Sequence, residues 1–183
     1  MKTRMLILCI AATLFGSNLG ATQSGAITES SEIRPGIPVS DGELTPAVQV
    51  HVKRGDVLRS ALRFVDAEQA YRRAAEIARG EGHLPSRTMW LLANSYYNDG
   101  DLRGAAAVLD QLAAEAARVG DLAVQALAMF NAAWLNGSAG RTAQAASRVA
   151  RLETLLRSPY MPGALREYLS ARLSTPSDVA VGH

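Results

Sequence analysis

The sequence predicts an all-α protein built from antiparallel helix hairpins that pack side by side. Two observations carry this prediction. Apolar residues recur every 3.6 positions from about residue 47 to residue 173, and this part of the chain is rich in Ala, Leu and Arg. A period of 3.6 residues is that of an amphipathic helix. Because 183 residues suit one domain, we expect a single helical body behind a flexible leader.

The N-terminus has the three-part layout of a secretory signal peptide. Lys2 and Arg4 make a positive start, residues 5–15 form an apolar run, and residues 16–26 are small or polar. The apolar run is shorter than the ~20 residues that span a bilayer as a helix. We therefore expect an exported protein, periplasmic or associated with the cell envelope.

Small residues favour cleavage after Ala21, which makes 1–21 the signal peptide, or after Ala26, and an uncleaved anchor is the alternative. The single cysteine, Cys9, lies in the apolar run, so the mature chain would offer no thiol for a disulfide, a nucleophile or a metal site. Loss of the two leader cations would leave 17 basic and 17 acidic residues. A neutral chain without a basic run predicts no nucleic-acid partner.

Residues 22–44 are predicted to be a flexible linker, because they contain turn-forming residues and no sustained apolar period. Thr45 and Pro46 then indicate the start of the helical domain, 45–173. Thr is a favoured N-cap, and Pro is tolerated at the first helical position, where its missing N–H costs nothing.

The clearest hairpin covers residues 86–118. Its first helix, about 88–97, and its second, about 102–117, each carry an apolar face at helical spacing. Gly100 can adopt the left-handed conformation that ends the first helix, and Asp101 can cap the second. One apolar side is left for a neighbouring hairpin to cover. The two faces consist of Met89, Leu92, Ala93, Tyr96, Leu102, Ala105, Ala106, Leu109, Leu112 and Ala113.

This hairpin resembles the tetratricopeptide repeat (TPR). The family's spacing of large, small and aromatic residues before a Gly-Asp turn and a buried Ala is matched by Met89, Leu92, Ala93, Tyr96, Gly100, Asp101, Leu102 and Ala105. A degenerate copy follows 40 residues later, with Asn136 at the aromatic position. Another copy lies 38 residues earlier, at Phe64, Ala67, Tyr71 and Ala74. The resemblance implies a short right-handed TPR-like solenoid of about three antiparallel helix hairpins.

The two ends of the predicted stack are less clear than its middle. No Gly separates the halves of the first copy, so residues 56–79 could form one continuous helix instead of part of a hairpin. An unrelated Ala-rich helical bundle is a further alternative. An apolar stripe at Leu165, Tyr168, Leu169 and Leu173 predicts a C-terminal capping helix. Residues 174–183 are expected to be a disordered tail.

The resemblance also implies a binding surface. In TPR proteins the first helices of the hairpins line a concave face that binds segments of partner proteins. Aromatic residues and Arg often anchor interfaces, and an Asn amide can both donate to and accept from a peptide backbone. Packing between hairpins is the alternative role for Trp90, Phe130 and Trp134. The residues carried over are Lys53, Arg59, Arg87, Trp90, Asn94, Tyr97, Asn98, Phe130, Asn131 and Trp134.

No catalytic, metal or cofactor motif is visible. The three histidines are far apart, Asp99-Gly100-Asp101 lacks the other ligands of a calcium loop, and no phosphate-binding Gly-rich loop occurs. We therefore expect a non-catalytic scaffold without cofactor or metal, which binds a protein or peptide partner. The alternatives are a structural subunit of a larger membrane complex, attached by the N-terminal segment or by its partners, and a small-molecule sensor with a pocket between hairpins.

Overall fold

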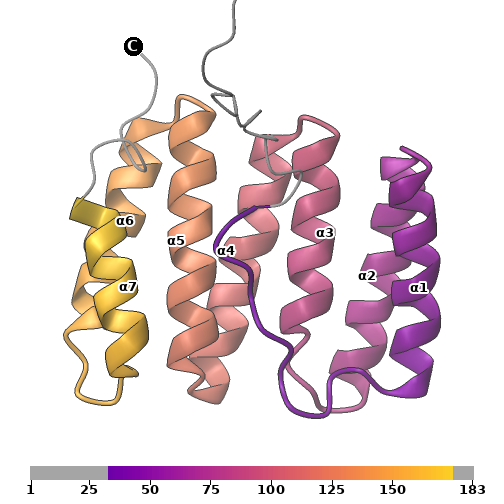
Figure 1. Cartoon of the computed structure of the whole chain (residues 1–183), viewed down its shortest axis with the longest axis horizontal. Coiled ribbons are helices and arrows are strands. Elements are labelled where there is room, and N and C mark those ends of the chain that lie inside the picture. The colour runs from indigo at the N-terminus through magenta and orange to yellow at the C-terminus, as the bar shows by residue number, and fades with distance from the viewer. Residues whose placement is uncertain (1–32, 175–183) are drawn as a thin grey trace, which may run out of the picture.

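The computed structural model describes residues 33–174 of the chain. Regular structure in this range is entirely helical, and helices that follow one another in the chain pack side by side (Figure 1). The prediction of an all-α protein is confirmed. The helices are α1 Pro46–Ser60, α2 Phe64–Gly80, α3 Ser86–Asn98, α4 Leu102–Val119, α5 Leu122–Ser138, α6 Thr142–Leu156 and α7 Gly163–Ser174.

The first two helices form a hairpin and not one continuous helix. The chain turns between them at Leu62, a non-glycine residue with a φ of 58°. Gly55 of α1 lies directly against the ring of Tyr71 in α2, where a Cβ would overlap the ring carbons. The missing side chain lets the two helices approach, and Tyr71 becomes fully buried. A turn without Gly explains why the sequence left both arrangements open.

The predicted turn of the middle hairpin is confirmed. Gly100 has a φ of 83°, in the left-handed region that Gly adopts at little cost, and it follows the last turn of α3. The Asp101 carboxylate accepts a hydrogen bond of 2.8 Å from the N–H of Gly104, which caps α4. Asp121 caps α5 in the same way through the N–H of Val124, at 2.9 Å.

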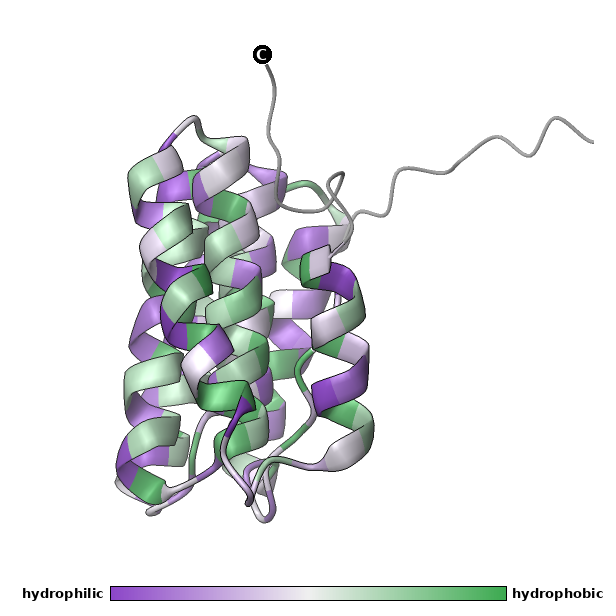
Figure 2. Cartoon of the chain, turned by 90° about the vertical axis from the view of Figure 1, so that its left-hand side faces the viewer, coloured by the Kyte–Doolittle hydropathy of each residue, from purple (hydrophilic) through white to green (hydrophobic). Residues whose placement is uncertain are grey.

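The core is densest around α3, α4 and α5. Leu109, Leu112 and Leu135 are fully buried there, together with the small residues Ala93 and Ala105 that bring helices close together. α7 packs mainly against α6 and buries only Leu169 completely. From the α6–α7 end, hydrophilic and hydrophobic residues alternate along the outer helices (Figure 2). The described helices also include none that is both long enough and apolar enough to cross a membrane.

Residues 33–44, here called the strap, precede α1 and run past α3 and α5 without helical structure (Figure 1). Ile33 and Ile37 are only 0% and 2% exposed. Residues 33–44 fall within the predicted flexible linker, yet these two side chains belong to the hydrophobic core. An extended segment with a few buried anchors has no apolar period, so its packing is invisible to a search for periodicity. The predicted signal peptide and its predicted cleavage sites, residues 22–32 and residues 175–183 lie outside the described range.

Candidate functional site

The strap lies on the surface that the TPR resemblance assigns to a partner. Trp90 and Asn94 of α3 and Phe130 and Asn131 of α5 belong to the predicted binding residues, and all four are at most 3% exposed. Three of them, Trp90, Asn94 and Asn131, contact the strap directly. We call the surface formed by these three residues the groove. The chain itself occupies it.

Two asparagine amides hold the strap by its backbone. The Oδ1 of Asn94 accepts a hydrogen bond of 2.6 Å from the N–H of Ile33, and the Nδ2 of Asn131 donates one of 2.8 Å to the carbonyl of Pro35. The Nδ2 of Asn94 donates to the Trp90 carbonyl at 2.9 Å, which orients this amide. Because both contacts to the strap are made with peptide groups, they would hold an extended segment whatever its side chains.

Trp90 forms the wall of the groove beside Gly36 of the strap. A Cβ at Gly36 would lie 3.6 Å from Cζ2 of the indole, an ordinary van der Waals distance. The Arg87 guanidinium lies 4.4 Å from the centre of the Trp90 ring, close enough for a cation–π interaction. Neither Nε1 of Trp90 nor Oδ1 of Asn131 has a hydrogen-bond partner in the described part of the chain, although both atoms are buried. Such atoms cost about 1–3 kcal/mol each.

Glu43 anchors the C-terminal end of the strap. Its carboxylate is fully buried at the start of α3, where it accepts hydrogen bonds from the N–H groups of Arg87 at 2.9 Å and Thr88 at 2.8 Å. The hydroxyls of Ser86 and Thr88 also lie 3.0 Å from its oxygens. A helix N-terminus offers unpaired N–H groups and favours negative charge. Glu43 is absent from the residues predicted from the sequence, because this cap is more than forty residues away and helix-start rules inspect only adjacent positions.

A second group of predicted residues gathers where α1 and α3 end. Tyr97 of α3 and Trp134 of α5 are half-buried, with ring centres 5.8 Å apart at an interplanar angle of 50°. Next to Tyr97, Asn98 lines a hollow of about 290 Å³ together with Arg59 of α1. Two predicted residues remain. Arg87 covers the ring of Trp90, and Lys53 is exposed on α1 and lines neither the groove nor the hollow beside Arg59.

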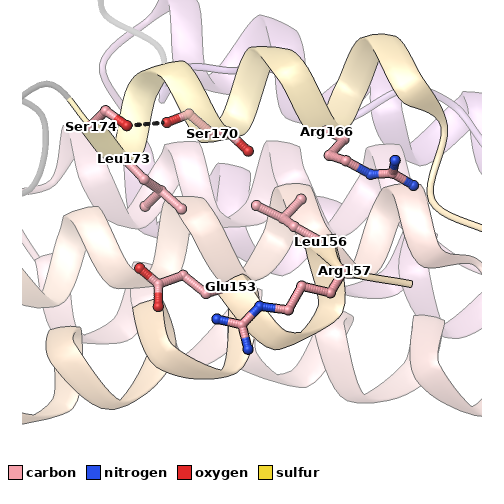
Figure 3. Close-up of a pocket in the computed structure, with 7 residues that line it drawn as sticks. All are labelled: Glu153, Leu156, Arg157, Arg166, Ser170, Leu173 and Ser174. Atoms are coloured by element: carbon pink, nitrogen blue, oxygen red, sulfur yellow. Dashed lines mark hydrogen bonds between the residues drawn. The ribbon is translucent and has the colours of Figure 1, made fainter. Parts of the chain in front are cut away.

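A larger hollow, of about 570 Å³, lies between α6 and α7 (Figure 3). Leu156 and Leu173 point into the space between the two helices, and charged side chains stand around it (Figure 3). Arg166 donates to the carbonyls of Ser158 and Met161, at 2.8 Å and 3.1 Å, so it holds the loop between these helices. The lining contains no nucleophile paired with a base, and we attribute the hollow to the loose packing of α7.

The side chains with shifted pKa values described next lie at contacts between helices, and neither of them lines the two hollows. Burial raises the pKa of Tyr71, whose hydroxyl also donates to Asp56 at 2.8 Å across the first hairpin. Burial and the neighbouring Asp99 raise the pKa of Glu68. No three His, Cys, Asp or Glu side chains between residues 33 and 174 are grouped so that they could hold a metal ion.

Comparison of the chain with protein-family models, with curated proteins and with solved structures found no match. Since no related protein indicates a function, what the site can bind is inferred from its geometry alone. The groove binds an extended backbone through Asn94 and Asn131, and it presents an aromatic wall with a cation above it. In this structure the segment that occupies it is residues 33–44 of the chain itself.

Proposed function

We propose that this protein is a non-catalytic scaffold that binds an extended segment of a protein partner along the groove between α3 and α5. The observation that carries the proposal is the pair of hydrogen bonds from Asn94 and Asn131 to the backbone of the strap. A groove that grips peptide groups two residues apart is suited to extended chains in general. The strap, held by these two hydrogen bonds within the same molecule, supports the proposal.

A TPR-like solenoid accounts for the position of the groove. The sequential packing of the helices and the Gly100–Asp101 turn support this interpretation, as do the fully buried Ala93 and Ala105 at the close approaches. In such a solenoid α1, α3 and α5 line one face, and α7 caps the last hairpin. The strap would then run along the concave face.

The leader supports a location in the cell envelope. A positive start, an apolar run and small residues before Ala21 and Ala26 are the features that export machinery recognises. The partner would then be an envelope protein, and binding would require no cofactor.

Affinity purification from envelope extract tests the proposal. The tagged full chain is compared with a variant that carries Asn94→Ala and Asn131→Ala, and with the control Gln69→Ala on the exposed side of α2. We expect proteins that are recovered with the parent and the control to be lost with the groove variant. Circular dichroism establishes that each variant is folded. Unchanged recovery by a folded groove variant would rule out binding through the groove.

A structural subunit of a larger complex is the second candidate, favoured by apolar residues on the outside of α1. Val50 and Val57, two turns apart, are 65% and 70% exposed. If this stripe is the contact, the substitutions Val50→Glu and Val57→Glu remove the partner and the groove variant keeps it. Mass spectrometry of the mature N-terminus adds a direct test, because an intact Met1 on a membrane-bound chain indicates a retained anchor.

A further inference from the structure

The strap is an incomplete ligand for the groove that it fills. It satisfies Oδ1 of Asn94 and Nδ2 of Asn131, but it leaves the indole N–H of Trp90 and Oδ1 of Asn131 buried without a partner. Trp90 is only 2% exposed, so solvent does not replace the missing acceptor. A segment that supplied an acceptor to the indole N–H would therefore bind more tightly than the strap does.

Gly36 occupies the strap position from which such an acceptor would reach the indole. A Cβ added there would lie 3.6 Å from Cζ2 and 4.0 Å from Cε2 of Trp90, and Cε2 is the ring carbon bonded to Nε1. The backbone of Gly36 is not in the left-handed region, so an ordinary residue can take its place. Nε1 itself lies more than 4 Å from that Cβ, so an acceptor atom one or two bonds beyond Cβ is needed to come within hydrogen-bond distance of it.

The charge around Trp90 indicates which short side chain at the position of Gly36 would be the best hydrogen-bond acceptor. The guanidinium of Arg87 lies over the same ring, 4.4 Å from its centre, which makes the potential there positive. Hydrogen bonds to a carboxylate are also stronger than those to a neutral amide or hydroxyl. Both effects favour Asp over Asn or Ser at this position.

The anchoring of the strap allows one part of it to leave. Glu43 is held at the start of α3, whereas Asp41 and Gly42 are exposed and Gly42 has a φ of 74°, as a turn residue. Residues 33–40 swing away about this turn when two bonds to Ser86 break: its hydroxyl donates to the Pro38 carbonyl at 2.7 Å and accepts from the N–H of Ser40 at 2.8 Å. Glu43 still accepts from the N–H groups of Arg87 and Thr88 after that exchange, so these two groups at the start of α3 stay capped.

We propose that residues 33–40 are a resident competitor, displaced by a partner segment that carries Asp at the position of Gly36 between two aliphatic residues at the positions of Ile33 and Ile37. This inference rests on the proposed function, because both concern the same groove. It adds the chemistry of the partner and the event that precedes its binding.

The intact chain tests the acceptor position. Gly36→Asp is compared with Gly36→Ala, in the parent and in a Trp90→Phe background that keeps a ring but loses the indole N–H. We expect the Asp variant to have a folded-to-unfolded ratio about tenfold above that of the Ala variant, the worth of one hydrogen bond. The difference should vanish with Trp90→Phe. An equal ratio for Asp and Ala in the parent, or the same difference in both backgrounds, overturns the assignment.

Exchange is tested with a full chain that carries a protease site inserted after Asp41. After cleavage, N-terminally acetylated, dye-labelled peptides of residues 33–41 are added and fluorescence anisotropy follows binding. We expect the peptide with Gly36→Asp to bind about tenfold more tightly than the one with Gly36→Ala, and to be displaced by unlabelled peptide. The Trp90→Phe chain should bind both peptides equally. Failure to exchange, or loss of the helical circular dichroism signal when the strap leaves, shows that the strap is a permanent part of the fold and overturns the proposal.

The two sets of experiments fail independently. Peptide exchange with a preference for Asp, but no envelope protein that depends on Asn94 and Asn131, supports the groove chemistry and contradicts the proposed function. A partner that does depend on these asparagines, with no gain from Asp, keeps the function and overturns the partner chemistry.

Discussion

The middle and the end of the helical stack differ sharply in how their helices are covered. Twelve of the seventeen residues of α5 are buried, against one of the twelve residues of α7. α5 packs between α4 and α6 and also lies against the strap, whereas α7 packs mainly on α6. A helix that is covered on every side can be apolar all round, and one that is covered on a single side needs a polar face.

Two features make α3 resemble α5 in burial and differ from α1: the strap, and a second neighbouring helix that α1 lacks at the end of the stack. All three helices come first in their hairpins, yet nine residues of α3 are buried and only Val48 and Gly55 of α1. The strap covers α3 and α5, and α1 is left with an exposed outer face. Burial in this protein thus depends on an extended segment as well as on the packing of hairpins.

The largest expected effect comes from removing buried volume in the middle. Leu135→Ala in α5 should lower the free energy of unfolding by about 3–4 kcal/mol, because it leaves a cavity in a fully buried site. Leu173→Ala in α7 removes the same atoms from a half-buried site and should cost about 1 kcal/mol or less. Urea denaturation of both variants measures the contrast. Equal losses would mean that α7 is as well packed as α5.

Next in size is the loss of the strap's anchor. Glu43→Ala removes a buried carboxylate and leaves the N–H groups of Arg87 and Thr88 without acceptors, so we expect a loss of about 2–3 kcal/mol. Asp41→Ala, in the same segment but exposed, is the control and should be close to neutral. Thermal unfolding of the parent and the two variants measures these losses of stability. A neutral Glu43→Ala would show that coverage of the middle does not depend on this anchor.

A smaller effect is expected in the first hairpin. Gly55→Ala gains about 1 kcal/mol of helix propensity but places a methyl group into the ring of Tyr71. Because Tyr71 is fully buried and cannot move aside freely, we expect a net loss of about 1–2 kcal/mol. Gly80→Ala, at the end of α2 with open space around it, should cost nothing. A gain from Gly55→Ala would indicate that this hairpin is as loosely packed as the α6–α7 end.

The smallest expected effect concerns Glu68, on α2 beside the middle hairpin. Burial, and then Asp99, raise its pKa above the ordinary value of 4.5, so the folded chain keeps this proton to a higher pH than the unfolded chain. Stability should therefore fall as the pH rises between these two pKa values.

Glu68→Gln cannot ionise and should remove that fall, with a gain below about 1 kcal/mol at pH 8 and none at pH 4. The exposed Glu76→Gln on the same helix is the control. Denaturation across this pH range measures both variants. A gain that is equal at pH 4 and pH 8 would have another cause than ionisation.

The amino-acid sequence was sufficient for the features that depend on neighbouring residues. The 3.6-residue period identified the helical body, and Gly100 and Asp101 predicted the turn of the middle hairpin, because caps and amphipathic faces involve residues a few positions apart. The choice of Asn94 and Asn131 as backbone clamps came from the TPR resemblance, which assigns them to the binding face, together with the chemistry of their amides. The structure places both on an extended segment, although this segment is the chain's own.

Long-range contacts required the tertiary structure. The strap has no periodic signal, and its anchors reach α3 and α5 across sixty-one residues at Ile33 and ninety-six at Pro35. One sign of the strap can be found in the sequence once the structure is known. α5 contains no charged residue, whereas a helix with a solvent-exposed face usually carries several. Whether residues 56–79 fold back as a hairpin was likewise decided by the close contact of Gly55 with Tyr71, because no residue at the turn itself distinguishes the two arrangements.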